Sequence, residues 1–190
     1  MVTSQELYLG FLAVLGAERG IELAISRAHA RAAFARGGFE VGRAHYRVMA
    51  VLHASFFVAC AAEVLLLDRR FPGMFGAFAV VVVLAAQVLR YAAVSTLGQQ
   101  WNVRIIVWPD AAPVTKGLYR FIRHPNYVAV VLELLFVPLV HGAFVTAAVY
   151  SMCNAALLVV RIREEERALG AGYAQAFRDR PRFVPRLFGG

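Results

Sequence analysis

The stretch AFAVVVVLAAQVL, residues 77–89, contains one polar side chain, that of Gln87, and no charge. It lies inside an apolar run of residues 74–94, and a helix needs about 20 apolar residues to cross the hydrocarbon core of a bilayer. This run therefore predicts a membrane-spanning helix. Three further runs have comparable length, at residues 7–25, 48–67 and 143–160. A shorter fifth run, residues 127–140, contains Pro138.

Only His141 and Gly142 separate the short run from residues 143–160, which favours a tight helical hairpin over two independent spans. The sequence predicts an all-α integral membrane protein with about five transmembrane helices, including this short hairpin, and a cytoplasmic C-terminal helix. No Lys or Arg precedes residues 7–25, Glu6 lies just before them, and no small-residue cleavage pattern follows. We therefore expect this first run to stay in the mature protein rather than act as a signal peptide.

The composition excludes several classes of protein. Of the 190 residues, 60% are hydrophobic and 17% are charged, with a mean hydropathy of +0.61, whereas soluble domains are about a quarter charged. Cys60 and Cys153 lie in apolar runs without CxxC or Cys/His spacing, which excludes a disulfide framework and a zinc site. We expect both thiols to be buried as small hydrophobic groups. P-loop, HExxH, GxSxG and strand-associated GxGxxG motifs are absent, which excludes soluble Rossmann-type methyltransferases and dehydrogenases.

Positive charge marks one side of the predicted membrane. The chain has 20 Lys and Arg residues against 12 Asp and Glu, and 16 of the basic residues fall in residues 26–47, 95–126 and 161–190. Five crossings place these three segments on one side, and basic residues near span ends stay in the cytoplasm. We therefore expect the N-terminus outside, the C-terminus in the cytoplasm and no nucleic-acid partner.

The densest group of chemically active side chains is TKGLYRFIRHPNY, residues 115–127. Pro125 suits the first turn of a helix, because its missing N–H costs nothing there. His124 then lies at the helix start, where free N–H groups and the positive end of the dipole favour an anionic group. A basic interfacial anchor with aromatic belt residues is the alternative interpretation.

A second cluster, RIREEER at residues 161–167, follows the last apolar run directly. On a helix, Arg161, Glu165, Leu169 and Tyr173 lie one turn apart and share a face. A solvated, salt-bridged helix face is the alternative. Both clusters emerge on the predicted cytoplasmic side, so together they have the charges to hold a zwitterionic small molecule.

Ionisable residues inside predicted spans are costly in lipid and usually line a protein interior or a water-filled cavity. The set comprises Glu18, Arg19, Glu22, His53, Glu63, Arg90 and Glu133. A local ion pair or snorkelling explains the first three, and snorkelling explains Arg90, whereas we expect Glu133 to line a cavity. Such charges also fit a small membrane transporter or scaffold with a midplane cavity. Gly16 and Gly20 have the spacing of a close-packing motif.

The two clusters together resemble the isoprenylcysteine carboxyl methyltransferase family of integral membrane enzymes, which is related to the phospholipid methyltransferases. The matching motifs are RHPNY at residues 123–127 and R-I-x-x-E-E-x-x-L at residues 161–169, with a hairpin between them. Leu97-Gly98 and Trp101 also resemble the family, so the resemblance covers about residues 95–185. One departure is Phe177, where a tyrosine is often found.

The N-terminal half is similar to a bacterial branch that O-methylates long-chain alkylpyrones or alkylresorcinols. The similarity lies in the pattern R-G-G-x-E-x-G at residues 36–42, and in Leu52-His53, Cys60 and Glu63. The resemblance divides the chain into N-terminal helices, residues 1–94, and a methyltransferase core, residues 95–190, with a cofactor loop, hairpin and tail.

The resemblance implies S-adenosylmethionine as cofactor, no metal, a bacterial cytoplasmic membrane, and a lipophilic or prenylated acceptor that enters from the surrounding membrane lipids. The expected cofactor contacts are Lys116, Gly117, Tyr119, Arg123, His124, Pro125, Tyr127, Glu165 and Glu166. The expected catalytic residues are Glu133, His124 and Arg161, and the expected acceptor contacts are Arg90, His53 and Trp101. A carboxylate acceptor needs an orienting cation, Arg161 or Arg90. A phenol or enol needs a base, for which the candidates in order are Glu133, His124 and His53.

Overall fold

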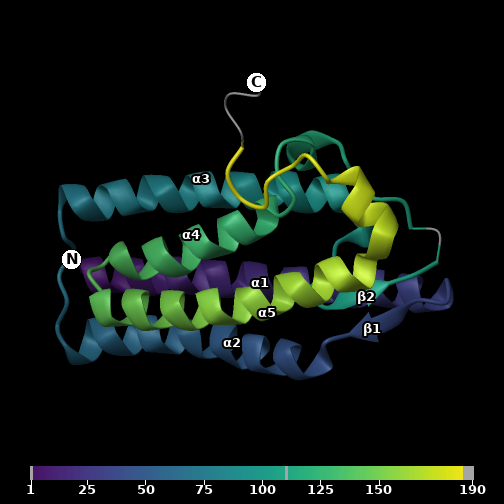
Figure 1. Ribbon diagram of the computed structural model, residues 1–190. Helices are drawn as coiled ribbons and strands as arrows, with labels where there is room; N and C mark the ends of the chain where they lie inside the picture. The colour runs from purple at the N-terminus through teal and green to yellow at the C-terminus, as the bar shows by residue number, and fades with distance from the viewer. Residues whose placement is uncertain (1, 110, 186–190) are drawn as a thin grey trace.

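The computed structural model describes residues 2–109 and 111–185 (Figure 1). Its five helices lie alongside one another and are α1 Ser4–Ala35, α2 Arg43–Leu66, α3 Met74–Leu97, α4 Pro125–Leu139 and α5 Phe144–Ala176. Two 3₁₀ turns, η1 Gly98–Gln100 and η2 Gly117–Arg120, and two strands, β1 Phe39–Val41 and β2 Ile105–Val107, complete the described elements. Arg186, one of the basic tail residues, lies outside the described residues.

Three of the helices are long and apolar enough to cross a membrane, namely α2, α3 with its extension to Gln100, and α5. Helix α4 is apolar but has only 15 residues, and α1 carries three charged side chains near its middle. Large apolar side chains are exposed on the outer faces, among them Val58, Val88 and Met152, as expected where helices meet lipid. The predicted helical membrane protein is confirmed at this level. The count of five crossings and the orientation stay predictions.

The two cysteines occupy different environments. Cys60 of α2 is buried in the core, whereas Cys153 of α5 is exposed. The prediction that both are buried is therefore wrong for Cys153. A membrane helix turns one face toward lipid, so an apolar run alone does not reveal which of its residues face the protein interior.

Helices α4 and α5 form the predicted hairpin. Helix α4 begins at Pro125 and ends one residue after Pro138. In the turn, Gly142 has φ 72°, a conformation that strains L side chains, and the N–H of Ala143 donates to the carbonyl of Pro138 at 3.0 Å. Helix α5 then continues well beyond its apolar part, with a kink at Gly170. The predicted C-terminal helix is thus an extension of the last spanning helix.

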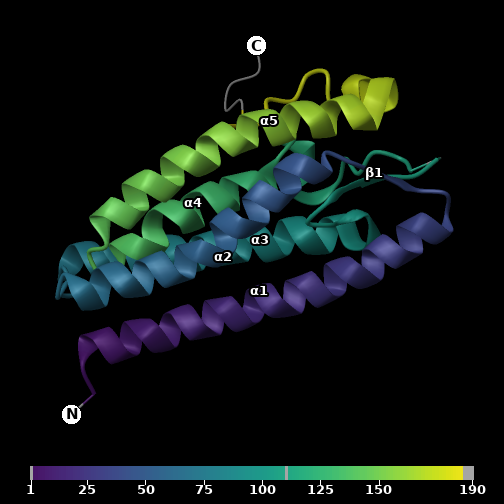
Figure 2. The same cartoon turned by 90° about the horizontal axis from the view of Figure 1, so that it is seen from below.

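The two ends of the bundle are built differently. At the end with the short turns, an apolar core is formed by buried side chains of α1 to α4, including Tyr8, Leu12, Phe56, Val64, Val83, Leu134 and Val137. At the other end, β1 and β2 pair in antiparallel register with Glu40 opposite Ile106. The sequence did not predict this ribbon of two three-residue strands, and the fold is otherwise helical, consistent with the expected all-α class. Figure 2 shows α1 as a separate layer beside the other four helices.

Candidate active site

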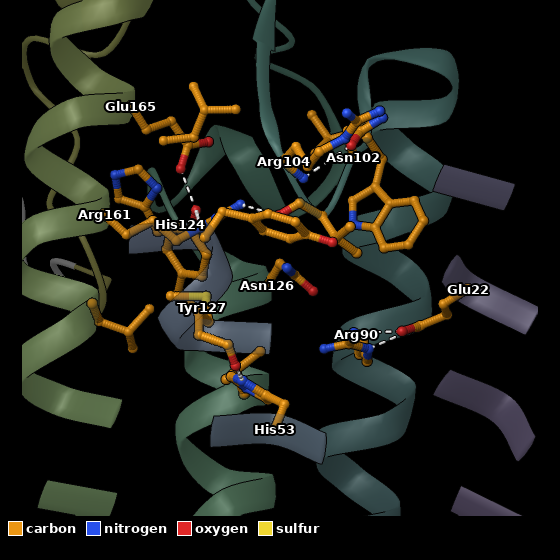
Figure 3. Close-up of a pocket in the computed structure, with 18 of the residues that line it drawn as sticks. Glu22, His53, Arg90, Asn102, Arg104, His124, Asn126, Tyr127, Arg161 and Glu165 are labelled. Atoms are coloured by element: carbon orange, nitrogen blue, oxygen red, sulfur yellow. Dashed lines mark hydrogen bonds and ion pairs between the residues drawn. The ribbon is translucent and has the colours of Figure 1, made fainter. Parts of the chain in front are cut away.

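A cavity of about 690 Å³ extends from the end of the bundle that carries the ribbon to the apolar core. All five helices and β2 contribute to its wall (Figure 3). Its labelled polar residues are Glu22, His53, Arg90, Asn102, Arg104, His124, Asn126, Tyr127, Arg161 and Glu165.

The helix start at residues 123–127 and the cluster after residue 160 meet at one wall of this cavity. Arg161 Nε donates a hydrogen bond to the Tyr127 hydroxyl at 2.7 Å, and this hydroxyl donates in turn to Glu165. Arg161 Nη2 donates to the carbonyl of Val103 at 2.8 Å. Arg161 is only 4% exposed, yet its Nη1 has no hydrogen-bond partner among the described residues. The His124 ring stacks on Tyr127 with 5.3 Å between ring centroids.

The alternative interpretation of residues 161–167, a solvated and salt-bridged helix face, applies only to the residues that point away from the cavity. Glu164 and Arg167 form an exposed ion pair at 2.6 Å. Arg161 and Glu165, by contrast, line the cavity. The helix therefore has one face for the cavity and one for solvent.

The C-terminal tail lies across the start of α4. The backbone N–H of Arg123 donates to the carbonyl of Pro181 at 2.9 Å. Glu166 accepts a hydrogen bond from Arg182 at 2.6 Å and pairs with His124 Nε2 at 3.0 Å. The hydrogen bond to Glu166 raises the pKa of Arg182. Glu166 thus joins the tail to His124, and it is not among the residues that line the described cavity.

The loop before α4 places its residues in two locations. Tyr119 lines the cavity and packs against Phe177, and burial raises the pKa of its phenol far above the usual value, so it stays protonated. Lys116 and Gly117 instead border a separate shallow hollow with Thr96. Gly117 has φ 56°, and a Cβ there would lie 2.7 Å from Thr96 Oγ1. The structure does not bring Lys116 and Gly117 to the cavity.

The three expected acceptor contacts, His53, Arg90 and Trp101, all line the cavity. The carbonyl of Met49 lies 2.8 Å from His53 Nδ1 and can only accept, so Nδ1 carries the proton and Nε2 is an acceptor in the neutral ring. Pro125, an expected cofactor contact, is buried in the first turn of α4 and lies off the described wall.

An ion cluster joins α1 to α3 and α4 at the cavity. Arg90 binds Glu22 through two hydrogen bonds, Nε to Oε1 at 2.7 Å and Nη2 to Oε2 at 2.5 Å. Arg19 lies 3.0 Å from Glu22 and 3.2 Å from Glu18, so the local ion pair in α1 is confirmed. Glu133 of α4 lies 3.6 Å from Arg19 and 3.7 Å from Arg90 and lines the cavity, as expected. The snorkelling interpretation of Arg90 is wrong, because its partner is an interior carboxylate.

Asn126 was not predicted as a site residue, yet it lines the cavity and its Oδ1 is buried without a described hydrogen-bond partner. Asn126 and Glu133 are seven residues apart, which places them on one face of a helix, so the spacing was a usable signal. Gly16 and Gly20 also line the cavity, and apart from the adjoining backbone and chain neighbours of α1 no described atom lies within 4 Å of a Cβ built on either. The close-packing interpretation does not hold within this chain.

Comparisons with known proteins identify the family of this chain. The family model described as "Isoprenylcysteine carboxyl methyltransferase (ICMT) family" matches residues 79–171. The uncharacterised protein YpbQ of Bacillus subtilis strain 168 is 39% identical over 158 residues, which cover 83% of this chain and 94% of YpbQ. The chain belongs to the isoprenylcysteine carboxyl methyltransferase family. An uncharacterised protein of Haemophilus influenzae strain Rd is 28% identical over 152 residues, 80% of this chain and 88% of that protein.

Membership of the isoprenylcysteine carboxyl methyltransferase family makes this chain a membrane methyltransferase. The matched residues run from α3 to just beyond the kink in α5. They include both sequence motifs and the hairpin between them. The cavity also uses α1 and α2, which lie before the match, so both parts of the predicted division contribute to one site.

Proposed function

We propose that this protein transfers a methyl group from S-adenosylmethionine to an oxygen atom of a lipophilic acceptor. The observation that carries the proposal is the buried Nη1 of Arg161, which has no hydrogen-bond partner in the described part of the chain and lies beside Glu165 and the Tyr127 ring. The cofactor has a carboxylate, an ammonium and a sulfonium, so its site needs a cation, an anion and an aromatic face that tolerates positive charge. Arg161 would hold the carboxylate, while Glu165 and Tyr127 would face the cationic groups.

The chain's own contribution to catalysis is positioning. Bound S-adenosylmethionine supplies an electrophilic methyl group, and a direct displacement at its carbon gains most from alignment. Glu166 pairs with His124 Nε2, and the His124 ring stacks on Tyr127. These contacts hold the two rings of the cofactor wall in place without a ligand. Apolar residues of the cavity such as Val130 and Leu158 limit the access of water.

The route by which the acceptor enters is inferred from the cavity-lining residues that are exposed at the surface. Four residues that line the cavity are also exposed at the surface, Gly20 and Leu23 on α1 and Ala50 and Ala54 on α2. The cavity therefore opens between these two helices, away from their ends, at a surface suited to lipid. Two acceptors fit such a route, an isoprenylcysteine-like carboxylate and the hydroxyl of a long-chain alkylpyrone or alkylresorcinol. We further propose that the active site faces the cytoplasm of a bacterial cell and requires no metal.

A transporter is the second candidate, and the position of the cavity speaks against it. A transporter needs a midplane site that opens alternately to both sides. Here the apolar core occupies the turn end of the bundle and closes the cavity on that side through Phe56, Leu134 and Val137, while the polar residues of the cavity lie toward the ribbon. This one-sided arrangement supports the enzyme.

Binding of radiolabelled S-adenosylmethionine to the purified protein in lipid nanodiscs tests the proposal. We expect His124→Ala and Glu165→Ala to abolish binding. Glu164→Ala is the matched control, because it removes a neighbouring carboxylate from the solvent face of the same helix. Retention of binding in both site variants would refute the assignment of this wall to the cofactor.

A further inference from the structure

Four residues with the smallest side chains frame the opening of the cavity between α1 and α2. They are Gly16 and Gly20, one helical turn apart on α1, and Ala50 and Ala54, one turn apart on α2. All four line the cavity, and three of them, Gly20, Ala50 and Ala54, are exposed at the surface. Small residues at this spacing usually let two membrane helices pack closely. Here they border a cavity, and we call these four residues the rim.

Helix α1 is held on both sides of the rim. Toward the turn end, Leu15 of α1 and Phe56 of α2 belong to the same apolar core. Toward the ribbon, Ser26 Oγ donates to Asn102 Oδ1 at 2.9 Å, and the Asn102 amide donates to the Ser26 carbonyl at 2.8 Å. Figure 2 shows α1 and α2 diverging toward the ribbon. Because α1 is fixed on both sides, the side chains of the rim set the width of the opening.

Polar atoms without hydrogen-bond partners lie inside the opening. Arg19 and Glu133 line the cavity, and Arg19 Nη1 and Glu133 Oε1 are buried with no hydrogen-bond partner among the described residues. Arg161 lines the same cavity and is only 4% exposed, and its Nη1 also has no partner in the described part of the chain. A buried polar atom without a partner is costly, and a bound polar group removes the cost. The cavity is therefore suited to the polar groups of its ligands.

The surface outside the rim is apolar. Leu23 lines the cavity and is exposed, and Ile21 and Val51 are exposed on the same two helices. Toward the turn end, Leu134 and Val137 belong both to the cavity wall and to the apolar core. A chain attached to a polar head in the cavity is thus blocked in that direction, whereas the rim leads it sideways into lipid.

We propose that the rim selects the methyl acceptor by the width of its apolar chain and not by the length of that chain. The polar head lies in the cavity, the first part of the chain lies between the rim residues, and the remainder stays in the surrounding lipid. A side chain added at the rim meets the acceptor chain, whereas carbon atoms added at the far end of the acceptor chain meet only lipid. The inference rests on the proposed function, and it holds for a carboxylate head and for a hydroxyl head.

A series of straight chains tests the independence from length. The purified protein in nanodiscs is given S-adenosylmethionine labelled in the methyl group and acceptors with undecyl, pentadecyl or nonadecyl chains, carried by a resorcinol ring or by the sulfur of N-acetylcysteine. We expect rates within about threefold across the series that is methylated, because lipid is as apolar as the protein surface that it meets. A sharp fall beyond one length would show a closed tunnel and overturn the proposal.

Substitutions at Gly20 test the selection by width. Each head also carries a dodecyl or a farnesyl chain, which share a main-chain length and differ in the methyl branches of the farnesyl chain. We expect Gly20→Ala to lower kcat/KM for the farnesyl chain more than for the dodecyl chain, and Gly20→Leu to lower both by about tenfold or more. Cofactor affinity should not change. An equal effect of Gly20→Ala on the two chains contradicts selection by width.

Gly10→Leu is the matched control. Gly10 is an exposed glycine of the same helix, it lies outside the described cavity wall, and a Cβ on either Gly10 or Gly20 has only its own helix and chain neighbours within 4 Å. Leucine is a better helix former than glycine, so both leucine variants should fold. We expect Gly10→Leu to leave every rate unchanged. A dimer that dissociates in Gly20→Leu but not in Gly10→Leu would show that the rim is a protein interface and overturn the proposal.

A photoreactive chain locates the acceptor without turnover. The pentadecyl form of each head, with a diazirine close to the head, is irradiated in nanodiscs with the protein bound to S-adenosylhomocysteine. We expect label on residues 16–23 and 50–57, lost in Gly20→Leu and kept in Gly10→Leu. Label on other helices alone contradicts the role of the rim. A protein that does not bind the cofactor, or that labels at the rim without methyl transfer to either head, contradicts the proposed function instead.

Discussion

Glu63 and Glu133 are the same residue type, each largely shielded from solvent in an apolar helix, α2 and α4 respectively, but their hydrogen bonding differs. Glu63 accepts hydrogen bonds from the N–H and hydroxyl of Thr146, both at 2.7 Å, from the N–H of Val145 at 3.2 Å and from Arg69 at 3.0 Å. It thereby satisfies free N–H groups at the start of α5. Glu133 has an oxygen without a described partner. The difference indicates that a charged residue inside the protein marks a ligand site when one of its hydrogen-bonding atoms has no partner among the described residues.

The largest expected effect is on stability, at the fully bonded glutamate. Glu63→Ala leaves Arg69 and the first N–H groups of α5 without their acceptor, and we expect a loss of about 3 kcal/mol in the free energy of unfolding. Denaturant unfolding in detergent micelles measures it. Cofactor affinity of the folded fraction should not change. A variant as stable as the unmodified protein would show that the bonds of Glu63 are not structural.

A smaller effect is expected at the cofactor wall. Arg161→Lys keeps the charge but cannot bond Tyr127 and Val103 and also present a third donor in the same plane. We expect cofactor affinity to fall by about 2 kcal/mol, roughly 30-fold. Isothermal titration with S-adenosylmethionine measures this change. Unaltered affinity would place the cofactor carboxylate elsewhere.

Tyr127→Phe removes the hydroxyl that connects Arg161 to Glu165 while it keeps the aromatic ring. The loss of one buried link should weaken cofactor binding by about 1 kcal/mol, roughly fivefold. The same titration detects it. If Tyr127→Phe bound as poorly as Arg161→Lys, the hydroxyl would itself be a direct cofactor contact.

The smallest effect is expected on the solvent face of α5. The Arg167 side chain is 74% exposed and pairs only with Glu164 among the described residues. Arg167→Ala should change both the free energy of unfolding and the cofactor affinity by less than about 0.5 kcal/mol. A larger loss in cofactor affinity would mean that the site extends beyond the cavity wall.

Local signals were readable from the sequence, and contacts between distant segments were not. Pro125 fixes the start of α4 and so the place of His124, and the one-turn spacing of Arg161 and Glu165 puts both on one face. The partner of Arg90 lies 68 residues away on α1, which no periodicity reveals. The ribbon also escaped prediction, because three-residue strands are too short for an alternating pattern.

The structure of the protein with S-adenosylhomocysteine bound, determined in nanodiscs, tests the central claim most directly. We expect ligand density in the cavity lined by α4 and α5, with the carboxylate at Arg161 Nη1 and the ammonium facing Glu165. The thioether sulfur should point along α4 toward Asn126 and Glu133. Ligand density at the shallow hollow beside Lys116 and Gly117, with an unoccupied cavity, would contradict it.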